Sequence, residues 1–174
     1  GRAHRGTIVA YCAPGRGCSF HVYLPRAAAG PGADARHDGG APAGRGAGQC
    51  VLYIDDDEVM CTLAERLLQR AGYHAVVCGS AVQALQRLVS DLHDVAIVVT
   101  DHNMPEMSGL ELCRVLAAQR PALPVVLTSG YLTEALRTEA AQLGVRAVLA
   151  KEQTFESLVD VVAAVLAGAP AVNG

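Results

Sequence analysis

Apolar and polar residues follow one pattern from residue 49 to residue 168 of this 174-residue chain. Short apolar runs alternate with stretches in which apolar residues recur at helical spacing. The runs predict strands at 51–54, 74–78, 95–99, 125–128 and 147–150. The stretches between and after them predict helices at about 58–71, 80–90, 109–119, 133–143 and 154–167. Strict alternation of strand and helix predicts a five-stranded, doubly wound parallel sheet with helices on both faces.

The first and last predicted helices each carry apolar residues four positions apart. Val59, Leu63 and Leu67 share one face of the first helix, and Leu158, Val162 and Leu166 share one face of the last. Residues at this spacing lie above one another on a helix, so we expect both stripes to face the core.

The first 48 residues have a different pattern. Residues 1–26 contain two segments of strand character around Pro14-Gly15, which predicts a β-hairpin. Residues 27–48 are Ala, Gly or Pro at 17 of 22 positions, a composition that cannot build a core and predicts a flexible linker. At the other end, residues 169–174 form a short tail.

The formal net charge of −3 hides an asymmetry. Residues 1–48 hold six Arg and two acids, whereas residues 49–174 hold eight basic and fifteen acidic residues. Because nucleic-acid binding needs a basic surface, the acidic part argues against such a partner. No apolar run is long enough to span a membrane, so we expect a cytoplasmic segment without membrane contact. The six cysteines lack CxxC spacing, which favours reduced thiols over a zinc site or disulfides.

Acidic residues follow two of the predicted strands. Asp55 and Asp56 come after the first strand, and Asp101 comes after the third. The first and third strands flank the switch point of such a sheet, so their carboxylates should converge. Carboxylates this close repel one another, and Mg²⁺ is suited to them. The alternative for the first acidic run is a solvated cap at a helix N-terminus.

The fourth and fifth predicted strands end in other polar groups. Thr128-Ser129 offers hydroxyls, and Lys151 offers an ammonium group. Acids, a hydroxyl and a cation at one sheet edge are suited to phosphoryl transfer onto a carboxylate. Lys151 is the one lysine among fourteen basic residues, which suggests a place that fits a compact ammonium.

Residues 49–168 resemble a response-regulator receiver domain in the segments VLYIDDDE, VVTDHNMPEMSGLEL, PVVLTSGY and AVLAK. The resemblance implies a flavodoxin-like fold with strand order 2-1-3-4-5. It further implies that Asp101 accepts a phosphoryl group from a phosphohistidine.

The same resemblance implies roles for the remaining residues. Asp56 would bind Mg²⁺ directly, Asp55 largely through water, and Asn103 through its backbone carbonyl. Ser129 and Lys151 would assist the transfer at the acceptor carboxylate.

Two positions depart from the family's usual pattern. Glu152 follows Lys151 where proline is usual, and Val148 stands where an aromatic residue is usual. Both positions concern the signalling face, so the resemblance implies intact phosphorylation chemistry without the usual aromatic switch.

The N-terminal segment HRGTIVAYCAPGRGCSFHVYLPR resembles the last two strands of the ATP-binding domain of sensor histidine kinases. Cys18 stands where that family commonly has Thr or Ser, and most of the ATP site is missing from this chain. Kinase remnant, linker and receiver in this order resemble the C-terminus of a hybrid sensor histidine kinase, in which few residues follow the last helix. We therefore expect a phosphoacceptor module of a His–Asp phosphorelay, with a phosphohistidine-bearing kinase or phosphotransfer domain as its partner.

Two other functions stay open. One is a receiver-like domain that binds partner proteins without being phosphorylated. The other is an Mg²⁺-dependent phosphatase, which usually needs a second acid just after the nucleophile, where this chain has His102-Asn103. Whether the chain is an enzyme also stays open. The resemblance implies that a receiver catalyses its own phosphorylation and dephosphorylation, but this chain lacks a complete ATP site. Its oligomeric state is not predicted.

Overall fold

The structure is a computed structural model that describes residues 7–13, 17–23, 46–168 and 172–173, with side chains for residues 46–168. The chain divides into two compact units, Gly1–Asp38 and Gly39–Gly174. Most of the expected linker, at residues 27–45, and most of the expected tail lie outside the described residues.

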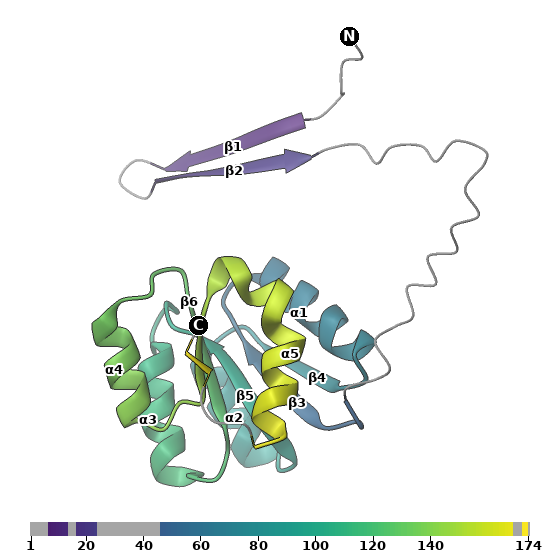
Figure 1. The fold of residues 1–174 in the computed structure, drawn as a ribbon, viewed down its shortest axis with the longest axis vertical. Coiled ribbons are helices and arrows are strands. Elements are labelled where there is room, and N and C mark those ends of the chain that lie inside the picture. The colour runs from purple at the N-terminus through teal and green to yellow at the C-terminus, as the bar shows by residue number, and fades with distance from the viewer. Residues whose placement is uncertain (1–6, 14–16, 24–45, 169–171, 174) are drawn as a thin grey trace, which may run out of the picture. The chain divides into compact units, whose positions relative to one another are not determined.

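The N-terminal unit contains a two-stranded antiparallel hairpin (Figure 1). Strand β1 (Thr7–Ala13) pairs with β2 (Gly17–Tyr23), so that Thr7 lies opposite Tyr23 and Ala13 lies opposite Gly17. The predicted hairpin is thereby confirmed, while its turn at 14–16 lies outside the described residues.

The second unit is built on a parallel sheet with the strand order β4-β3-β5-β6-β7-β8. Its first five strands confirm the predicted order 2-1-3-4-5. They are β3 (Cys50–Ile54), β4 (His74–Cys78), β5 (Val95–Asp101), β6 (Val125–Ser129) and β7 (Ala147–Ala150). The two-residue strand β8 (Val172–Asn173) pairs in parallel with β7 and was not predicted.

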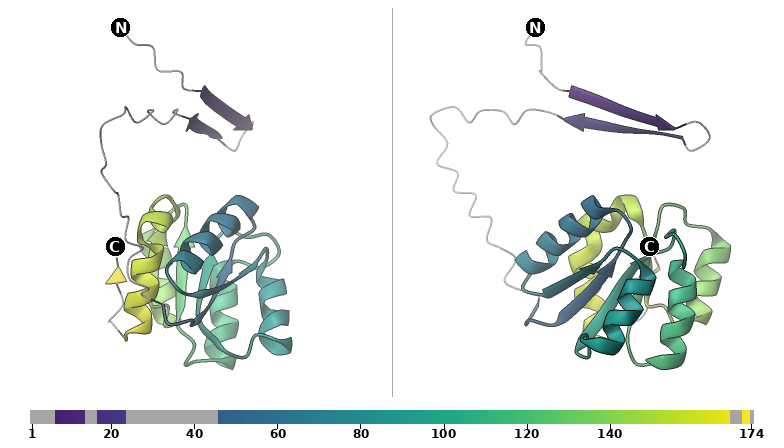
Figure 2. Two further views of the ribbon diagram at one scale, coloured as in Figure 1. Left: turned by 90° about the vertical axis from the view of Figure 1, so that its right-hand side faces the viewer. Right: turned by 180° about the vertical axis from the view of Figure 1, so that it is seen from behind.

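Five α-helices cover the sheet, and each predicted helix boundary is confirmed to within one residue. They are α1 (Glu58–Arg70), α2 (Ala81–Ser90), α3 (Gly109–Gln119), α4 (Glu134–Gln142) and α5 (Thr154–Leu166). A short 3₁₀ turn, η1 (Lys151–Gln153), joins β7 to α5. Helices α1 and α5 lie on one face of the sheet, and α2, α3 and α4 lie on the other (Figure 2). Within the described part of the chain, no helix combines the length and the apolar character needed to cross a membrane.

The core has two apolar layers, one on each face of the sheet. In β3, Leu52 belongs to the cluster beneath α2, α3 and α4, whereas Tyr53 belongs to the cluster beneath α1 and α5. Leu158 and Val162 of α5 are fully buried in the second cluster, which confirms the predicted stripe at these positions. Because helices cover both faces of the sheet, the sequence of β3 is a continuous apolar run rather than an alternation of apolar and polar residues.

The predicted core stripe of α1 is wrong at two of its three positions. Val59 and Leu63 are 65% and 42% exposed, whereas Cys61, Ala64 and Leu68 are buried. The buried stripe therefore contains two short side chains. A search for large apolar residues four positions apart gives little weight to Ala and Cys. These short side chains nevertheless let a helix pack close to a sheet.

Candidate functional site

Three carboxylates converge at the edge of the sheet where β3 and β5 end. Asp55 directly follows β3, and Asp101 is the last residue of the adjacent β5. Carboxylate oxygens of Asp55, Asp56 and Asp101 all lie within 4.8 Å of one another. Asp55 and Asp101 are 0% and 2% exposed, and Asp56 is exposed. Parallel strands thus bring together Asp55 and Asp101, which are 46 residues apart in the sequence.

Lys151 reaches this cluster from the end of β7. Its ammonium nitrogen lies 3.1 Å from each carboxylate oxygen of Asp55 and 3.1 Å from Oδ2 of Asp101. Burial lowers the pKa of Lys151, but the charges of Asp101 and Asp55 together outweigh burial, so its pKa is raised overall. The side chain is therefore a charged bridge between two buried acids, as expected of a lysine in a place sized for an ammonium group.

The carboxylate of Asp55 is surrounded by donors from its own chain. Oδ1 accepts the backbone N–H of Asp57 at 2.9 Å, and Oδ2 accepts the hydroxyl of Tyr53 at 3.4 Å. Lys151 donates to the same carboxylate. Burial raises the pKa of Asp55, and the Asp57 N–H and Lys151 oppose that rise. Both oxygens of Asp55 are thus bonded, and each of them also contacts Lys151.

Asp101 differs from Asp55 in having one oxygen without a partner. Its Oδ2 pairs with Lys151, whereas its buried Oδ1 has no hydrogen-bond partner among the described residues. A buried carboxylate oxygen without a donor is costly, and a hard cation or an incoming electrophile would satisfy it. With Asp55 and Asp56 close by, the donor set is all oxygen and fits a Mg²⁺ ion.

The loop after β5 is fixed closely against Asp101. The N–H of Gly109 donates to the carbonyl of His102 at 3.0 Å, and a Cβ on Gly109 would collide with the Asp101 carbonyl oxygen. Met104 is buried and anchors the same loop, while Asn103 is exposed. Only glycine therefore lets α3 begin this close to Asp101.

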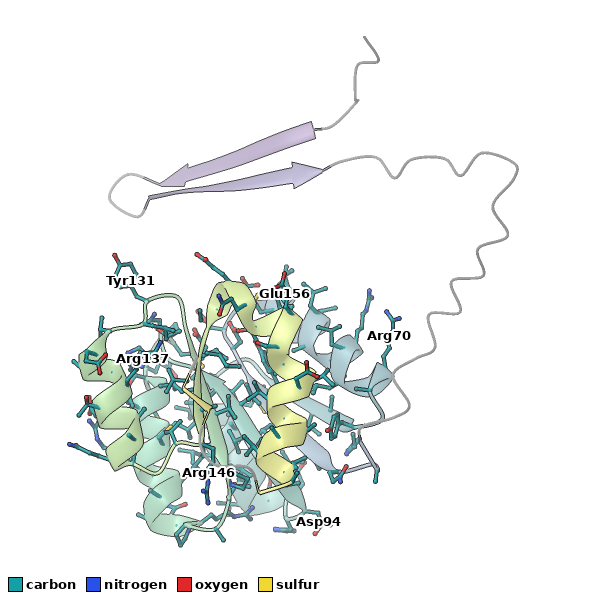
Figure 3. The ribbon with its side chains drawn as sticks, in the orientation of Figure 1. Arg70, Asp94, Tyr131, Arg137, Arg146 and Glu156 are labelled. Atoms are coloured by element: carbon teal, nitrogen blue, oxygen red, sulfur yellow. The ribbon has the colours of Figure 1, made fainter. Side chains whose placement is uncertain are left out.

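The hydroxyl of Ser129 lies at the end of β6 but is bonded within its own loop. Its Oγ accepts the N–H of Tyr131 at 3.1 Å and donates to the carbonyl of Tyr131 at 3.0 Å. Thr128, the alternative hydroxyl, donates instead to the carbonyl of Thr100 inside the sheet at 3.4 Å. The side chain of Tyr131 is 82% exposed and projects into solvent (Figure 3). Ser129 must release the Tyr131 carbonyl before it can donate to a ligand.

The acidic run after β3 divides between two roles. The side chain of Asp57 caps α1 by accepting the N–H groups of Val59 and Met60, while Asp55 and Asp56 join the acid cluster. A cleft of about 390 Å³, lined by Asp55 and Asp56 among others, opens beside the cluster. The helix-cap interpretation therefore holds for Asp57 alone.

Sequence reasoning missed one residue of this site, Tyr53. It is 1% exposed, and burial, followed by the Asp55 charge, raises its pKa well above the usual range of tyrosine. The phenol thus stays protonated and able to donate. Period-two alternation along β3 could have found it, because residues two apart lie on the same side of a strand.

Comparison with known proteins identifies the second unit. The family model for the response regulator receiver domain matches residues 51–163. Transcriptional regulatory protein ZraR of Escherichia coli strain K12 is 32% identical over 108 residues, which is 62% of this chain and 24% of ZraR. Sensory/regulatory protein RpfC of Xanthomonas campestris pv. campestris is 34% identical over 118 residues, which is 65% of this chain and 16% of RpfC.

A solved structure, that of a response regulator receiver protein from Pseudomonas putida, is 29% identical to the chain with a TM-score of 0.62. The match covers 67% of this chain and 97% of that chain. The chain spans about a quarter of the length of ZraR, so the similarity concerns one domain of these longer relatives.

Proposed function

The chain belongs to the response regulator receiver family of two-component signalling, and we propose that its receiver domain takes a phosphoryl group from a phosphohistidine onto Asp101. The observation that carries this proposal is the buried Oδ1 of Asp101, a carboxylate oxygen that has no donor while its neighbour Oδ2 is held by Lys151. An oxygen aimed without a partner at the sheet edge is free to act as a nucleophile.

In the proposed transfer, Oδ1 of Asp101 attacks the phosphorus atom. A P–O bond forms, the P–N bond of the phosphohistidine breaks, and its electron pair returns to the imidazole nitrogen. Lys151, held by Asp55, offsets the negative charge that reaches Asp101. Ser129 turns away from the Tyr131 carbonyl and donates a hydrogen bond to a phosphoryl oxygen, keeping its proton.

Asp55, Asp56 and Asp101, with the backbone carbonyl of Asn103, would hold a Mg²⁺ ion in this proposal. The ion would neutralise negative charge shared by the acids and the phosphoryl oxygens. The clustering of the three carboxylates within 4.8 Å supports this cofactor, because only one ammonium group is present to balance them.

We further propose that the receiver, at residues 49–168, follows the remnant of a kinase ATPase domain at 1–26 and a linker at 27–48, as in a hybrid sensor histidine kinase. The antiparallel pairing of β1 with β2 and the similarity to a sensory/regulatory protein support this arrangement. The similarity to transcriptional regulatory proteins favours the alternative that this receiver domain belongs to a response regulator rather than to a kinase. The test is the gene sequence upstream of residue 1. A helix with a phosphorylatable histidine and a nucleotide-binding domain encoded there would establish the hybrid-kinase arrangement.

The test is direct phosphorylation of the purified chain by a small acyl phosphate in Mg²⁺, and then by a phosphohistidine donor. We expect one phosphoryl group on the peptide that contains Asp101. Asp101→Asn should abolish labelling. Asp94→Asn is the matched control, because Asp94 is an exposed acid at the opposite end of the unit from Tyr131 (Figure 3). Wild-type labelling of Asp101→Asn would overturn the assignment, and no labelling of the wild type would favour a domain that only binds partners.

A further inference from the structure

We propose that Tyr53 is a positioning residue of the acid site: its hydroxyl orients the Asp55 carboxylate, which in turn holds the Lys151 ammonium beside Asp101. The consequence for phosphorylation rests on the proposed function, whereas the effect on Lys151 does not.

Tyr53 is among the largest fully buried side chains of the described residues and lies in the apolar layer between the sheet and helices α1 and α5. Its neighbours in register are Val77 on β4 and Val99 on β5, neither of which offers a hydrogen-bond partner. A hydroxyl in such a layer is costly unless it is bonded, and Oδ2 of Asp55 is within reach at 3.4 Å. The phenol therefore touches the acid site from its buried side.

The three strands that lead to Asp55, Asp101 and Lys151 have similar residues just before these charged groups. The residues two positions before them, Tyr53, Val99 and Leu149, all belong to the cluster beneath α1 and α5. Side chains alternate along a strand, so Val99 lies one step below Asp101 on the same side of β5, and Tyr53 precedes Asp55 by the same two positions. Of the three, only Tyr53 carries a polar atom. Tyr53 is therefore the residue of these three whose side chain donates a hydrogen bond to a charged group of the site, the carboxylate of Asp55.

Asp55 is held by a donor on each oxygen in addition to Lys151. The Asp57 N–H fixes Oδ1, and the Tyr53 hydroxyl fixes Oδ2. Without that hydroxyl, Oδ2 is held by Lys151 alone, and the carboxylate gains freedom to rotate. Because Lys151 contacts both Asp55 and Asp101, a turn of Asp55 displaces the ammonium from Asp101. A small displacement of the Lys151 ammonium from Asp101 should lower the rate of phosphorylation.

The experiment uses the single lysine of the chain as its reporter. Nitrogen-15 lysine labelling gives one side-chain signal, that of Lys151. Tyr53→Phe removes only the hydroxyl and should shift this signal. It should also slow phosphorylation by a small acyl phosphate roughly three- to tenfold, the effect expected from losing one modest hydrogen bond. Tyr73→Phe is the control, because Tyr73 lies in the same apolar cluster but precedes β4 at the opposite edge of the sheet. It should change neither quantity.

A double-mutant cycle tests the route through Asp55. In an Asp55→Asn background, Tyr53→Phe should shift the Lys151 signal no further. A reciprocal measurement leaves Tyr53 unchanged: Asp55→Asn should shift the Cζ signal of Tyr53 in carbon-13 tyrosine-labelled protein.

An unchanged Lys151 signal in folded Tyr53→Phe would overturn the inference. So would an equal shift with and without Asp55, or an unchanged Tyr53 signal in Asp55→Asn. If the wild-type chain is never phosphorylated, the proposed function fails, but the two spectra still decide the role of Tyr53.

Discussion

The acid site at the ends of β3 and β5 and the neighbouring side formed by β7 and α4 hold their side chains in different ways. At the acid site, charged groups from three strands are joined by ion pairs with defined partners. On the β7–α4 side, Val148 is 3% exposed and belongs to an apolar cluster with Leu136 and Ala140 of α4. The charged side chains of the first region are held by directional ion pairs, whereas Val148 in the second region is held by apolar packing.

From this difference we expect that, in the proposed phosphoacceptor, phosphorylation of Asp101 and movement of β7 are separate events. The acid site holds the proposed phosphoacceptor Asp101 and its partner Lys151, whereas β7 carries the small Val148 where the resemblance to receiver domains implies an aromatic residue. The two regions are connected through Ser129, whose hydroxyl is bonded to the backbone of Tyr131. We therefore expect a signal to leave the site through the Tyr131 loop rather than through β7.

The largest expected effect is at Lys151, because the acid site depends on its position. Lys151→Arg keeps the charge but replaces a compact ammonium with a longer, planar group. A misplacement of about 1 Å can cost on the order of 100-fold in rate. We expect single-turnover transfer from a phosphohistidine donor to fall by about this factor, with an unchanged thermal midpoint.

Arg146→Lys is the matched control for this substitution, since Arg146 is exposed and lies away from Tyr131 at the other end of the unit (Figure 3). Its rate should equal that of the wild type. A wild-type rate in Lys151→Arg would mean that Lys151 is only a surface charge and that the contrast between the two regions is weaker than proposed.

A second effect concerns stability in Mg²⁺. A ligand present at 100 times its dissociation constant stabilises a folded protein by about 2.7 kcal/mol. Thermal unfolding with Mg²⁺ should therefore shift upward by several degrees, because the ion relieves repulsion among Asp55, Asp56 and Asp101. Asp56→Asn should lose most of this shift, and Asp94→Asn should keep it. Equal shifts in both variants would place the binding elsewhere.

The smallest expected effect is on the β7–α4 side. A phosphate mimic at Asp101 should draw the Ser129 hydroxyl away from Tyr131 and change the amide signals of both residues strongly. Val148 offers little bulk to move, and its amide signal should change much less. A change at Val148 as large as that at Ser129 would contradict the proposed separation of chemistry from output.

The sequence by itself predicted the five α-helices, the first five strands of the parallel sheet and most of the candidate acid site. Helix and strand boundaries follow from local periodicity, and Asp55, Asp101 and Lys151 were found because each stands where a buried strand ends. Parallel strands bring such ends to one edge, so position in the pattern was enough to expect convergence. The same reasoning was wrong for Val59 and Leu63, because which face of a helix is buried depends also on its short residues.

Only the tertiary structure decided how these residues are bonded. Lys151 bridges two acids that lie 96 and 50 positions before it, and such contacts depend on strand register and rotamers rather than on local pattern. The same holds for the buried Oδ1 of Asp101 without a donor and for the bond between Ser129 and Tyr131. Sequence periodicity places a side chain on a face of an element, whereas the partner of each polar atom is set by the packing of several elements at once.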